Sequence, residues 1–433
     1  MASLALLGGP KAVTAPRPLW PQVGEVEIAA VQAALVASQR DSSYLNSMPG
    51  EGPVADFEAR LRAHLGRAYA VATNSGAAAI QMALYAAGVG AGDEVIVSPY
   101  TWGQTVSPIL HQLGTPVFAD IDAATYVMTP AAVAAAVTPR TRAILAVHIF
   151  GHPVDMAGIR AVGRRHGLPV IEDCAQAMGA RVDGREVGTF GDLACFSFGD
   201  GKQIIGGDGG CVVTDAPEHF ERLVEIGSHP ARQTRDIKTP ATARYIDSLT
   251  YTFRIHPLAA VLVSSQLGFL HPWNAQRRQN HQRLNAAIAG LPYVRGVHEA
   301  PGAEHVFYRY SPTFVADAAE GLSREAVVQA LEAEGVPMNL GYVRTPIYLR
   351  PRFQERVYFF GRGLPWSLHP AQGPRYAPGD CPVAERRCAH EELDMGLASA
   401  LRGDQSTLVD QYAAAFHKVW EERDRLRQWR RTG

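Results

Sequence analysis

The sequence predicts an α/β protein with a mostly parallel central sheet, helices on both faces, and a smaller C-terminal α+β domain. Between about residues 70 and 215, short runs rich in β-branched and aromatic residues alternate with stretches of helical apolar spacing. This alternation is typical of parallel strands joined by helical crossovers. Past about residue 265 helical patterns mix with shorter strand-like runs. We therefore divide the chain into an N-terminal segment (1–30), a large domain (31–265) and a small domain (266–433).

The expected strands are, in chain order, EVIVSP (94–99), TPVFADI (115–121), AILAVHIF (143–150), LPVIEDC (168–174), LACFSF (193–198) and GGCVVT (209–214). Residues 77–87 and 156–166 have the apolar spacing of helices that cover such a sheet. In the small domain, 407–429 is expected to form one final helix with an apolar stripe. The Pro/Gly-rich segment 364–382 is expected to lie outside the core.

Composition excludes several classes of function. The chain of 433 residues has 41 Lys and Arg against 42 Asp and Glu, so its net charge of −1 gives no electrostatic basis for binding nucleic acid or an anionic membrane. The five cysteines form no CxxC pair, which indicates reduced thiols. Neither a signal peptide nor a membrane span is recognisable. We expect a soluble, cytoplasmic protein that acts on small molecules.

Two polar stretches follow expected strands and are candidates for ligand contact. In ATNSGAAAIQMAL (72–84) a polar turn runs directly into a helix, whose free N–H groups, with the hydroxyls of Thr73 and Ser75, could bind a phosphate. A simple N-cap explains the same residues. In IEDCAQAMGA (171–180), Asp173 closes an apolar strand, where it could serve a ligand, cap a helix or form a salt bridge.

Two further stretches lie at strand ends. In FSFGDGKQIIGGDGG (196–210), Ser197 ends a strand and Lys202 lies inside a glycine-rich bend. In SPYTWGQT (98–105), Trp102 follows another strand, although large aromatic residues in such places are commonly part of the core. Because ligands bind outside the carboxyl ends of parallel strands, the fold would gather all four stretches in one crevice.

Together these residues match the requirements of pyridoxal 5′-phosphate. Lys202 would form a Schiff base with its aldehyde and act as acid and base. Asp173 would keep the pyridine nitrogen protonated and Trp102 would stack on the ring, while Gln176 would reach the ring hydroxyl. The expected phosphate ligands are Asn74, Ser75, Gly76 and Ser197. Glycines in the bend would let the backbone carry Lys202 close to a bulky cofactor.

Other motifs have simpler explanations. GVGAGDE (88–94) ends a helix instead of starting one, so we interpret it as a helix-to-strand turn and not a dinucleotide loop. His148 and His152 flank a strand end without a third ligand nearby in the sequence, and we predict no metal site. Tyr308, Tyr342 and Arg344 are candidates for substrate contact, with structural roles equally open.

The sequence resembles the DegT/DnrJ/EryC1/StrS family of pyridoxal-phosphate enzymes, which have the aspartate aminotransferase fold, fold type I. The residues that carry the resemblance are LLGGPKAV, FEARLRAHLG (57–66), ATNSGAAAI, GAGDEVIVSPYTW, AVHIFGHPVDM (146–156), IEDCAQAMGA, GTFGDLACFSFGDGK, GGDGG, YTFRIHPLAAVLVSSQL (251–267) and HVFYRY (305–310). The resemblance implies a homodimer with shared active sites and an amino donor such as glutamate or glutamine. Lys202, where the sugar dehydratases of the family have histidine, favours transamination.

The resemblance also bears on the substrate. The GGP-containing start and PIYLRPRF (346–353) are similar to aminocyclitol aminotransferases and 3-amino-5-hydroxybenzoate synthases. The family usually has an asparagine that reaches the partner's phosphate where this chain has Thr252, and AHEELDMGLASALRG (389–403) replaces the tryptophan–leucine–histidine motif of the cyclitol branch. We expect an aminotransferase for a cyclitol or nucleotide-linked sugar in secondary metabolism, such as antibiotic biosynthesis. A dehydrating, aromatising enzyme and a non-catalytic cofactor-binding regulator remain alternatives.

Overall fold

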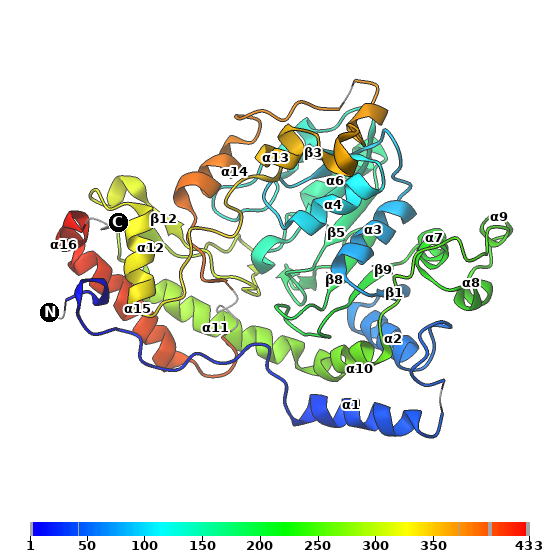
Figure 1. The fold of residues 1–433 in the computed structure, drawn as a ribbon, viewed down its shortest axis with the longest axis horizontal. Coiled ribbons are helices and arrows are strands. Elements are labelled where there is room, and N and C mark those ends of the chain that lie inside the picture. Colours follow the sequence, from blue (N-terminus) through cyan, green and yellow to red (C-terminus); the bar gives the residue numbers. More distant parts are fainter. Residues whose placement is uncertain (1–2, 42, 372, 397–400, 430–433) are drawn as a thin grey trace.

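A computed structural model describes residues 3–41, 43–371, 373–396 and 401–429. Its centre is a seven-stranded sheet with the order β1-β9-β8-β5-β4-β2-β3 (Figure 1). β9 runs antiparallel to both of its neighbours, and the remaining neighbours in this sheet are parallel. The strands are β1 (Tyr69–Thr73), β2 (Glu94–Val97), β3 (Thr115–Phe118), β4 (Thr141–Val147), β5 (Val170–Asp173), β8 (Leu193–Ser197) and β9 (Gly210–Thr214).

Alternating side chains of the strands serve two separate apolar clusters. In β1, Val71 belongs to a cluster with residues of α3 (Gly76–Ala86), whereas Ala70 and Ala72 belong to one with residues of α2 (Pro53–Leu65) and α10 (Pro257–Gln266). Because successive side chains of a strand point to opposite faces, each face of the sheet must be covered by helices. The expected α/β fold with a mostly parallel sheet is confirmed.

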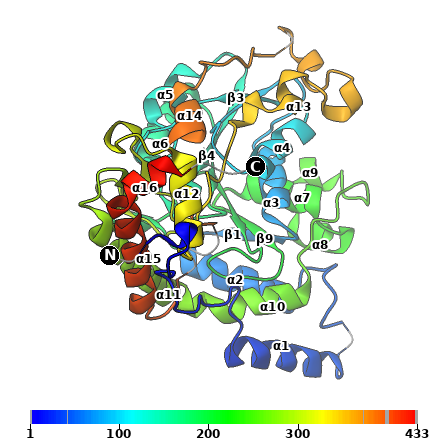
Figure 2. The ribbon, with the colours of Figure 1, turned by 60° about the vertical axis from the view of Figure 1, so that its left-hand side comes forward.

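Helices cover both faces of the sheet. α3 packs against α7 (Pro217–Gly227) and α4 (Gly103–His111), while α2 packs against β1 and α10 (Figures 1 and 2). The others in this part are α1 (Glu25–Ser38), α5 (Pro130–Ala135), α6 (Met156–His166), α8 (Pro230–Asp236) and α9 (Pro240–Ala243). A small sheet joins β6 (Arg181–Val182), β7 (Arg185–Glu186) and β11 (Ala303–Glu304).

A third apolar cluster lies in the C-terminal part of the chain. Its helices are α11 (Leu270–Ile288), α12 (Arg324–Ala333), α15 (Ser406–Glu421) and α16 (Arg423–Gln428), with β10 (Val294–Arg295) paired to β12 (Thr313–Phe314). The N-terminal residues Leu4 and Val13 are buried in this same cluster. Glu334 holds that segment in place, because its carboxylate accepts hydrogen bonds from the backbone N–H groups of Ala5 and Ala12 at 2.7 and 2.8 Å.

The segment from about residue 341 to 388 follows α12 in the chain, but it packs against the central sheet. Its buried apolar residues belong to the apolar cluster that includes Val71 and residues of α3. The segment contains two short α-helices, α13 (Pro351–Gln354) and α14 (Pro382–Arg386). Three 3-10 helices, η5 (Ile347–Leu349), η6 (Tyr358–Gly361) and η7 (Trp366–Leu368), lie before α13 and between the two. The expectation that 364–382 lies wholly outside the core is wrong for Trp366. Its ring is buried edge-on against Phe353, and its Nε1 donates a hydrogen bond to the Tyr376 hydroxyl at 3.2 Å.

Two other expectations about elements need correction. β1 was not among the expected strands, because YAVAT (69–73) runs without a break into the polar turn before α3. The single final helix is instead α15 and α16, divided at Glu422, and the change of direction lets Leu426 reach the apolar cluster against α12. Among the described residues, no helix combines the length and the apolar character needed to cross a membrane. The division at residue 265 stays a prediction.

Candidate active site

A cavity of about 440 Å³ opens where strands of the central sheet end and the following helices begin. Asp173 is the last residue of β5 and Ser197 the last of β8, and both contribute to its wall. Eight of the residues predicted for the cofactor line it together: Asn74, Ser75, Gly76, Trp102, Asp173, Gln176, Ser197 and Lys202. The crevice predicted from strand ends is therefore present as one continuous space.

The start of α3 forms one end of this cavity. Ser75 is the N-cap, and its Oγ accepts a hydrogen bond from the Ala78 N–H at 3.1 Å. The first-turn N–H groups of Gly76 and Ala77 have no acceptor within the helix and suit an anion. The N-cap and phosphate-seat interpretations are thus compatible. A Cβ on Gly76 would lie 2.7 Å from the Ser197 Cβ, so glycine is needed where helix and strand meet.

The Asp173 carboxylate is oriented by two donors. Its side chain is buried, with 3% of the residue's surface exposed. The Thr105 hydroxyl donates to Oδ2 at 2.8 Å, and the Ala175 N–H donates to Oδ1 at 3.0 Å. Since a buried carboxylate needs hydrogen-bond donors or a cation, a cationic ring nitrogen in the cavity would complete its environment.

The glycine-rich bend brings Lys202 to the cavity. The Lys202 N–H donates to the Gly199 carbonyl at 3.1 Å, which closes a tight turn after β8. Gly207 and Gly209 have φ of 82° and 137°, where side chains are strained. A Cβ on Gly210 would lie 2.4 Å from the Ser75 carbonyl oxygen, so the returning strand passes directly behind the helix start. The Lys202 Nζ lies 4.6 Å from the centroid of the Tyr308 ring.

Gln176 links the cavity to the C-terminal part of the chain. Its Oε1 accepts from the Phe150 N–H at 2.7 Å, and its Nε2 donates to the Tyr342 hydroxyl at 3.0 Å. Tyr342 stacks on Trp102 with ring centroids 5.8 Å apart. Trp102 itself is 53% exposed and forms the outer wall of the cavity. The candidate substrate residues Tyr308 and Tyr342 therefore both adjoin residues of the cavity.

The buried carboxyl group of Glu392 holds the backbone of Tyr342 in place. The Tyr342 N–H donates to Glu392 Oε1 at 2.8 Å. Burial, reinforced by the nearby Asp394 carboxylate, raises the pKa of Glu392 to about 8. Burial likewise raises the pKa of the Tyr342 hydroxyl above its ordinary value, so Tyr342 remains a neutral hydrogen-bonding partner.

Four predicted residues do not line the cavity themselves: Tyr308 and Tyr342, which contact residues of its wall, and Thr252 and Arg344. Thr252 has an exposed side chain, and its carbonyl accepts from Asn74 Nδ2 at 3.4 Å. Its contact with a partner's phosphate stays a prediction. Arg344 is exposed and does not line this cavity. Part of the expected departure in 389–403, residues 397–400, lies outside the described residues.

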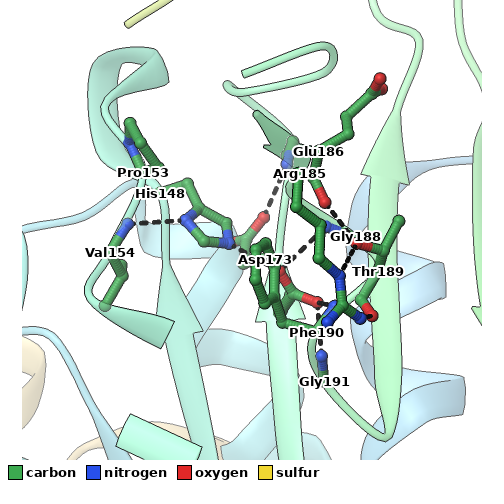
Figure 3. Close-up of polar contacts among 12 residues, drawn as sticks. His148, Pro153, Val154, Asp173, Arg185, Glu186, Gly188, Thr189, Phe190 and Gly191 are labelled. Carbon is green, nitrogen blue, oxygen red and sulfur yellow. Dashed lines mark hydrogen bonds and ion pairs between the residues drawn. The ribbon is translucent and has the colours of Figure 1, made fainter. Parts of the chain in front are cut away.

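Sequence reasoning missed the role of Thr105 and that of a buried pair formed by His148 and Glu172. Figure 3 shows His148 and Val154 together with Gly188, Phe190 and Gly191, the residues around this pair. His148 lines the cavity, with Nε2 3.1 Å from Glu172 Oε2, and its Nδ1 accepts from the Val154 N–H at 2.9 Å. Glu172 also accepts backbone hydrogen bonds from Gly188, Phe190 and Gly191. Although burial alone would raise it, the hydrogen bond and the charge of His148, together with the N–H groups of Gly191 and Gly188, hold the pKa of Glu172 below its ordinary value. The adjacent acids Glu172 and Asp173 in IEDC were the available signal.

Within the described part of the chain, two groups of side chains bring potential metal ligands together. His148, Glu172 and Cys174 are all buried, and His64, Glu186 and His271 form a second set, each with ligand atoms within 4.8 Å of one another. In the first set both ring nitrogens of His148 already have protein partners. In the second set Glu186 pairs with both histidines, at 3.1 and 3.3 Å. Hydrogen bonding within the protein accounts for both groups.

The cavity fits pyridoxal phosphate in its chemistry. The glycine at position 76 leaves room between α3 and Ser197 where N–H and hydroxyl donors converge, as a phosphate requires. Asp173, Trp102 and Lys202 supply a carboxylate for the ring nitrogen, an aromatic face and an amine for the aldehyde. One space thus holds the carboxylate, the aromatic ring, the amine and the helix start that were predicted for the cofactor.

Comparison with known proteins agrees with this geometry. Residues 28–371 match the model of the DegT/DnrJ/EryC1/StrS aminotransferase family. A UDP-N-acetyl-3-dehydro-α-D-glucosamine 3-aminotransferase of Acidithiobacillus ferrooxidans is 36% identical, over 84% of this chain and 88% of that protein. An L-glutamine:2-deoxy-scyllo-inosose aminotransferase of Streptoalloteichus tenebrarius is 34% identical, over 98% and 99%. The crystal structure of an aminotransferase from Psychrobacter cryohalolentis superposes with a TM-score of 0.79 at 28% identity, covering 94% of this chain and 99% of that one.

The recognised motifs, the fold and the cavity therefore lead to one assignment. The family's enzymes depend on pyridoxal phosphate, and the residues predicted to bind and use it line a single cavity here. The chain belongs to the DegT/DnrJ/EryC1/StrS aminotransferase family and is a pyridoxal-phosphate-dependent aminotransferase of fold type I.

Proposed function

We propose that this enzyme transfers an amino group from glutamate or glutamine to the keto group of a cyclitol or a nucleotide-linked sugar. The observation that carries the proposal is the shared cavity of Lys202, Asp173, Trp102 and the start of α3. The relatives named above, a UDP-sugar aminotransferase and a cyclitol aminotransferase, support both acceptor classes. A role in secondary metabolism is consistent with the second of them.

The chain's own residues have distinct tasks in this reaction. Bound pyridoxal phosphate supplies an aldehyde that accepts the amino group and a ring that withdraws electrons. Lys202 Nζ removes the proton from the donor carbon that bears the amino group, and it later returns a proton to the acceptor carbon. Asp173, held by Thr105 and Ala175, stabilises positive charge at the ring nitrogen. Trp102 and Tyr342 exclude water from one side of the cavity.

A homodimer is part of the proposal. Apolar side chains are exposed on α1, including Val26 and Ile28, and around residue 249, where Leu249 is 90% exposed. Burying such surface against a second copy would be favourable, because large exposed apolar patches commonly mark interfaces. Thr252 lies beside the second of these surfaces in the sequence, and it would then approach the partner's active site. Cytoplasmic location likewise stays a prediction.

The proposal is tested by the first half-reaction. The purified holoenzyme is incubated with glutamine or glutamate, and the absorbance spectrum is followed for conversion of the bound cofactor from its aldehyde to its amine form. Conversion at stoichiometric yield is expected. Lys202→Ala should bind the cofactor but convert it at least about 10²-fold more slowly, since general acid–base catalysis contributes that much or more. Arg140→Gln, a change at an exposed site, is the matched control.

The outcomes separate the candidate functions. No conversion with any amino acid donor would reject the aminotransferase proposal for this chain. Loss of water from an amino-cyclohexene substrate without amino transfer would instead support the dehydrating, aromatising alternative. Cofactor binding without either reaction would support a regulator.

A further inference from the structure

The side-chain amide of Gln176 is held at both ends by residues that do not themselves line the cofactor cavity. Its oxygen accepts from the Phe150 N–H at 2.7 Å, and its nitrogen donates to the Tyr342 hydroxyl at 3.0 Å. Because an amide accepts only at oxygen and donates only from nitrogen, these two partners fix the direction in which the Gln176 side chain points. Its orientation in the cavity is therefore decided from outside the cavity.

Phe150 reaches Gln176 from a strained backbone conformation. Its φ of 59° and ψ of 0° lie in the left-handed region, which a bulky residue adopts only where its surroundings impose it. In this conformation its N–H donates to Gln176, while its carbonyl accepts from the Tyr308 N–H at 2.8 Å. Such strain is concentrated at active sites and ligand contacts. This conformation indicates that the orientation of Gln176 serves the site.

The ring of Tyr342, the other partner of Gln176, has three neighbours of its own. The Arg309 guanidinium carbon lies over the ring, 4.4 Å from its centroid. Trp102 stacks on it at a centroid distance of 5.8 Å, and Phe150 packs edge-on at 5.5 Å. Two residues that line the cofactor cavity, Trp102 and Gln176, thus contact the same tyrosine.

Arg309 is itself fixed by a two-point ion pair. Its Nε and Nη2 donate to the two carboxylate oxygens of Asp394 at 3.0 and 2.8 Å. Asp394 is buried, and the Ser311 hydroxyl donates to its Oδ1 at 3.2 Å. A pair of this kind holds the plane of the guanidinium group in one orientation. That plane can stack on an aromatic ring in a way that a lysine ammonium cannot reproduce.

We propose that Arg309, anchored by Asp394, is a positioning residue for the cofactor: it fixes the ring of Tyr342, which in turn holds Trp102 and Gln176 in place. Arg309 does not line the cavity, so it acts through Tyr342. The inference rests on the predicted contacts of Trp102 and Gln176 with the cofactor and is independent of the amino acceptor. Loss of this alignment should therefore be visible in cofactor binding before any substrate is added.

The test is titration of the apoenzyme with pyridoxal phosphate, followed by absorbance. Arg309→Lys keeps a cation for Asp394 but removes the planar group over Tyr342. We expect the cofactor dissociation constant to rise about fivefold or more, since a cation–π contact or a hydrogen bond contributes on that scale. The absorption maximum of the bound cofactor should also shift, because Trp102 no longer keeps its stacking position. Tyr342→Phe, which removes only the hydroxyl that Gln176 meets, should raise the dissociation constant by a similar factor.

Arg283 offers a matched control. It forms the same kind of two-point pair with Asp410, at 2.7 Å for both hydrogen bonds, but it lies outside the cofactor cavity and contacts none of the residues above. Arg283→Lys should therefore leave the dissociation constant and the absorption maximum unchanged.

A double-mutant cycle separates positioning from a general structural role. In the Tyr342→Leu background the residue through which Arg309 acts is gone, so Arg309→Lys should change the dissociation constant less than about twofold. A second cycle remains available if either of these variants does not fold. It combines Tyr342→Phe with Gln176→Leu, and the effect of Tyr342→Phe should likewise disappear.

The outcomes distinguish the inference from the proposed function. Wild-type cofactor affinity in Arg309→Lys, or an equally large effect of that change in the Tyr342→Leu background, would overturn the inference. Unchanged affinity in Gln176→Leu would reject the predicted contact of Gln176 with the cofactor, and the inference with it. Failure of the glutamine half-reaction in the wild type would reject the proposed function alone, because cofactor binding is measured without substrate.

Discussion

Replacing Gly76 with alanine should weaken cofactor binding, because the helix start and the end of β8 meet at this residue. The added Cβ would lie 2.7 Å from the Ser197 Cβ and 3.0 Å from its Oγ. Ordinary van der Waals contact begins near 3.4 Å, so the closer approach is about 0.7 Å too short. Neither atom belongs to a flexible chain end. Either α3 or β8 must move, and both carry donors of the phosphate seat.

The size of the effect follows from the cost of overpacking. Inserting a methyl group into a close-packed site costs about 1–3 kcal/mol. If that cost falls on the cofactor-bound state, the dissociation constant should rise by roughly 5- to 150-fold. The assay is titration of the apoenzyme with pyridoxal phosphate, followed by absorbance. Gly90→Ala is the matched control, since a Cβ there meets no atom within 4 Å.

A double-mutant cycle distinguishes this steric mechanism from a general loss of stability. Ser197→Gly removes the atoms that the new methyl group would meet, although it also removes a hydroxyl from the seat. The Gly76→Ala change should therefore cost much less in the Ser197→Gly background, with a coupling of about 1 kcal/mol or more. Strict additivity, or wild-type affinity in Gly76→Ala, would refute the reasoning.

Three further predictions concern groups around the site. Thr105→Val removes a hydrogen bond to the buried Asp173 carboxylate and should slow the glutamine half-reaction about tenfold in stopped-flow measurements, whereas Thr105→Ser should retain most of the rate. Glu392, with its pKa raised from 4.5 to about 8 by burial and the nearby Asp394, makes folding less favourable as pH rises from about 4.5 to 8. Glu392→Gln should therefore gain melting temperature relative to the wild type across that range; a constant difference would contradict this. Burial lowers the pKa of His152 from 6.5 to about 4, so the unfolded chain takes up its proton first and stability falls as pH drops from about 6.5 to 4. His152→Gln should show a shallower decline of melting temperature in acid, and an unchanged slope would count against it.

Sequence patterns predicted the chemistry of the site because its residues follow strands. Asp173 and Ser197 end β5 and β8, and parallel strands bring such ends to one edge of the sheet whatever the loops do. The glycine-rich bend was also informative. Gly207 and Gly209 have positive φ, which glycine adopts without strain, so the glycines themselves indicated a tight bend. Local patterns and the topology of the sheet were sufficient for these residues.

The contacts that the sequence did not predict join distant parts of the chain. Thr105 lies 68 residues before Asp173, and nothing in SPYTWGQT indicates which carboxylate its hydroxyl will meet. Tyr342 reaches Gln176 across 166 residues, and Trp366 is buried although it lies in a segment rich in proline and glycine. The contacts of Tyr342 and Trp366 depend on how the segment 341–388 returns to the sheet, and hydrophobic periodicity contains no information about that path.

This division between local and distant contacts has a consequence for specificity. Residues that handle the cofactor come from the sheet edge, whereas a second cavity beside Trp102, of about 370 Å³, is completed by Ile347, Arg350, Arg352, Phe353 and Tyr358 of the returning segment. A change of charge in that segment can alter which acceptor binds while Lys202, Asp173 and the start of α3 keep their positions. One catalytic cavity could thus serve neutral and phosphorylated acceptors in different relatives.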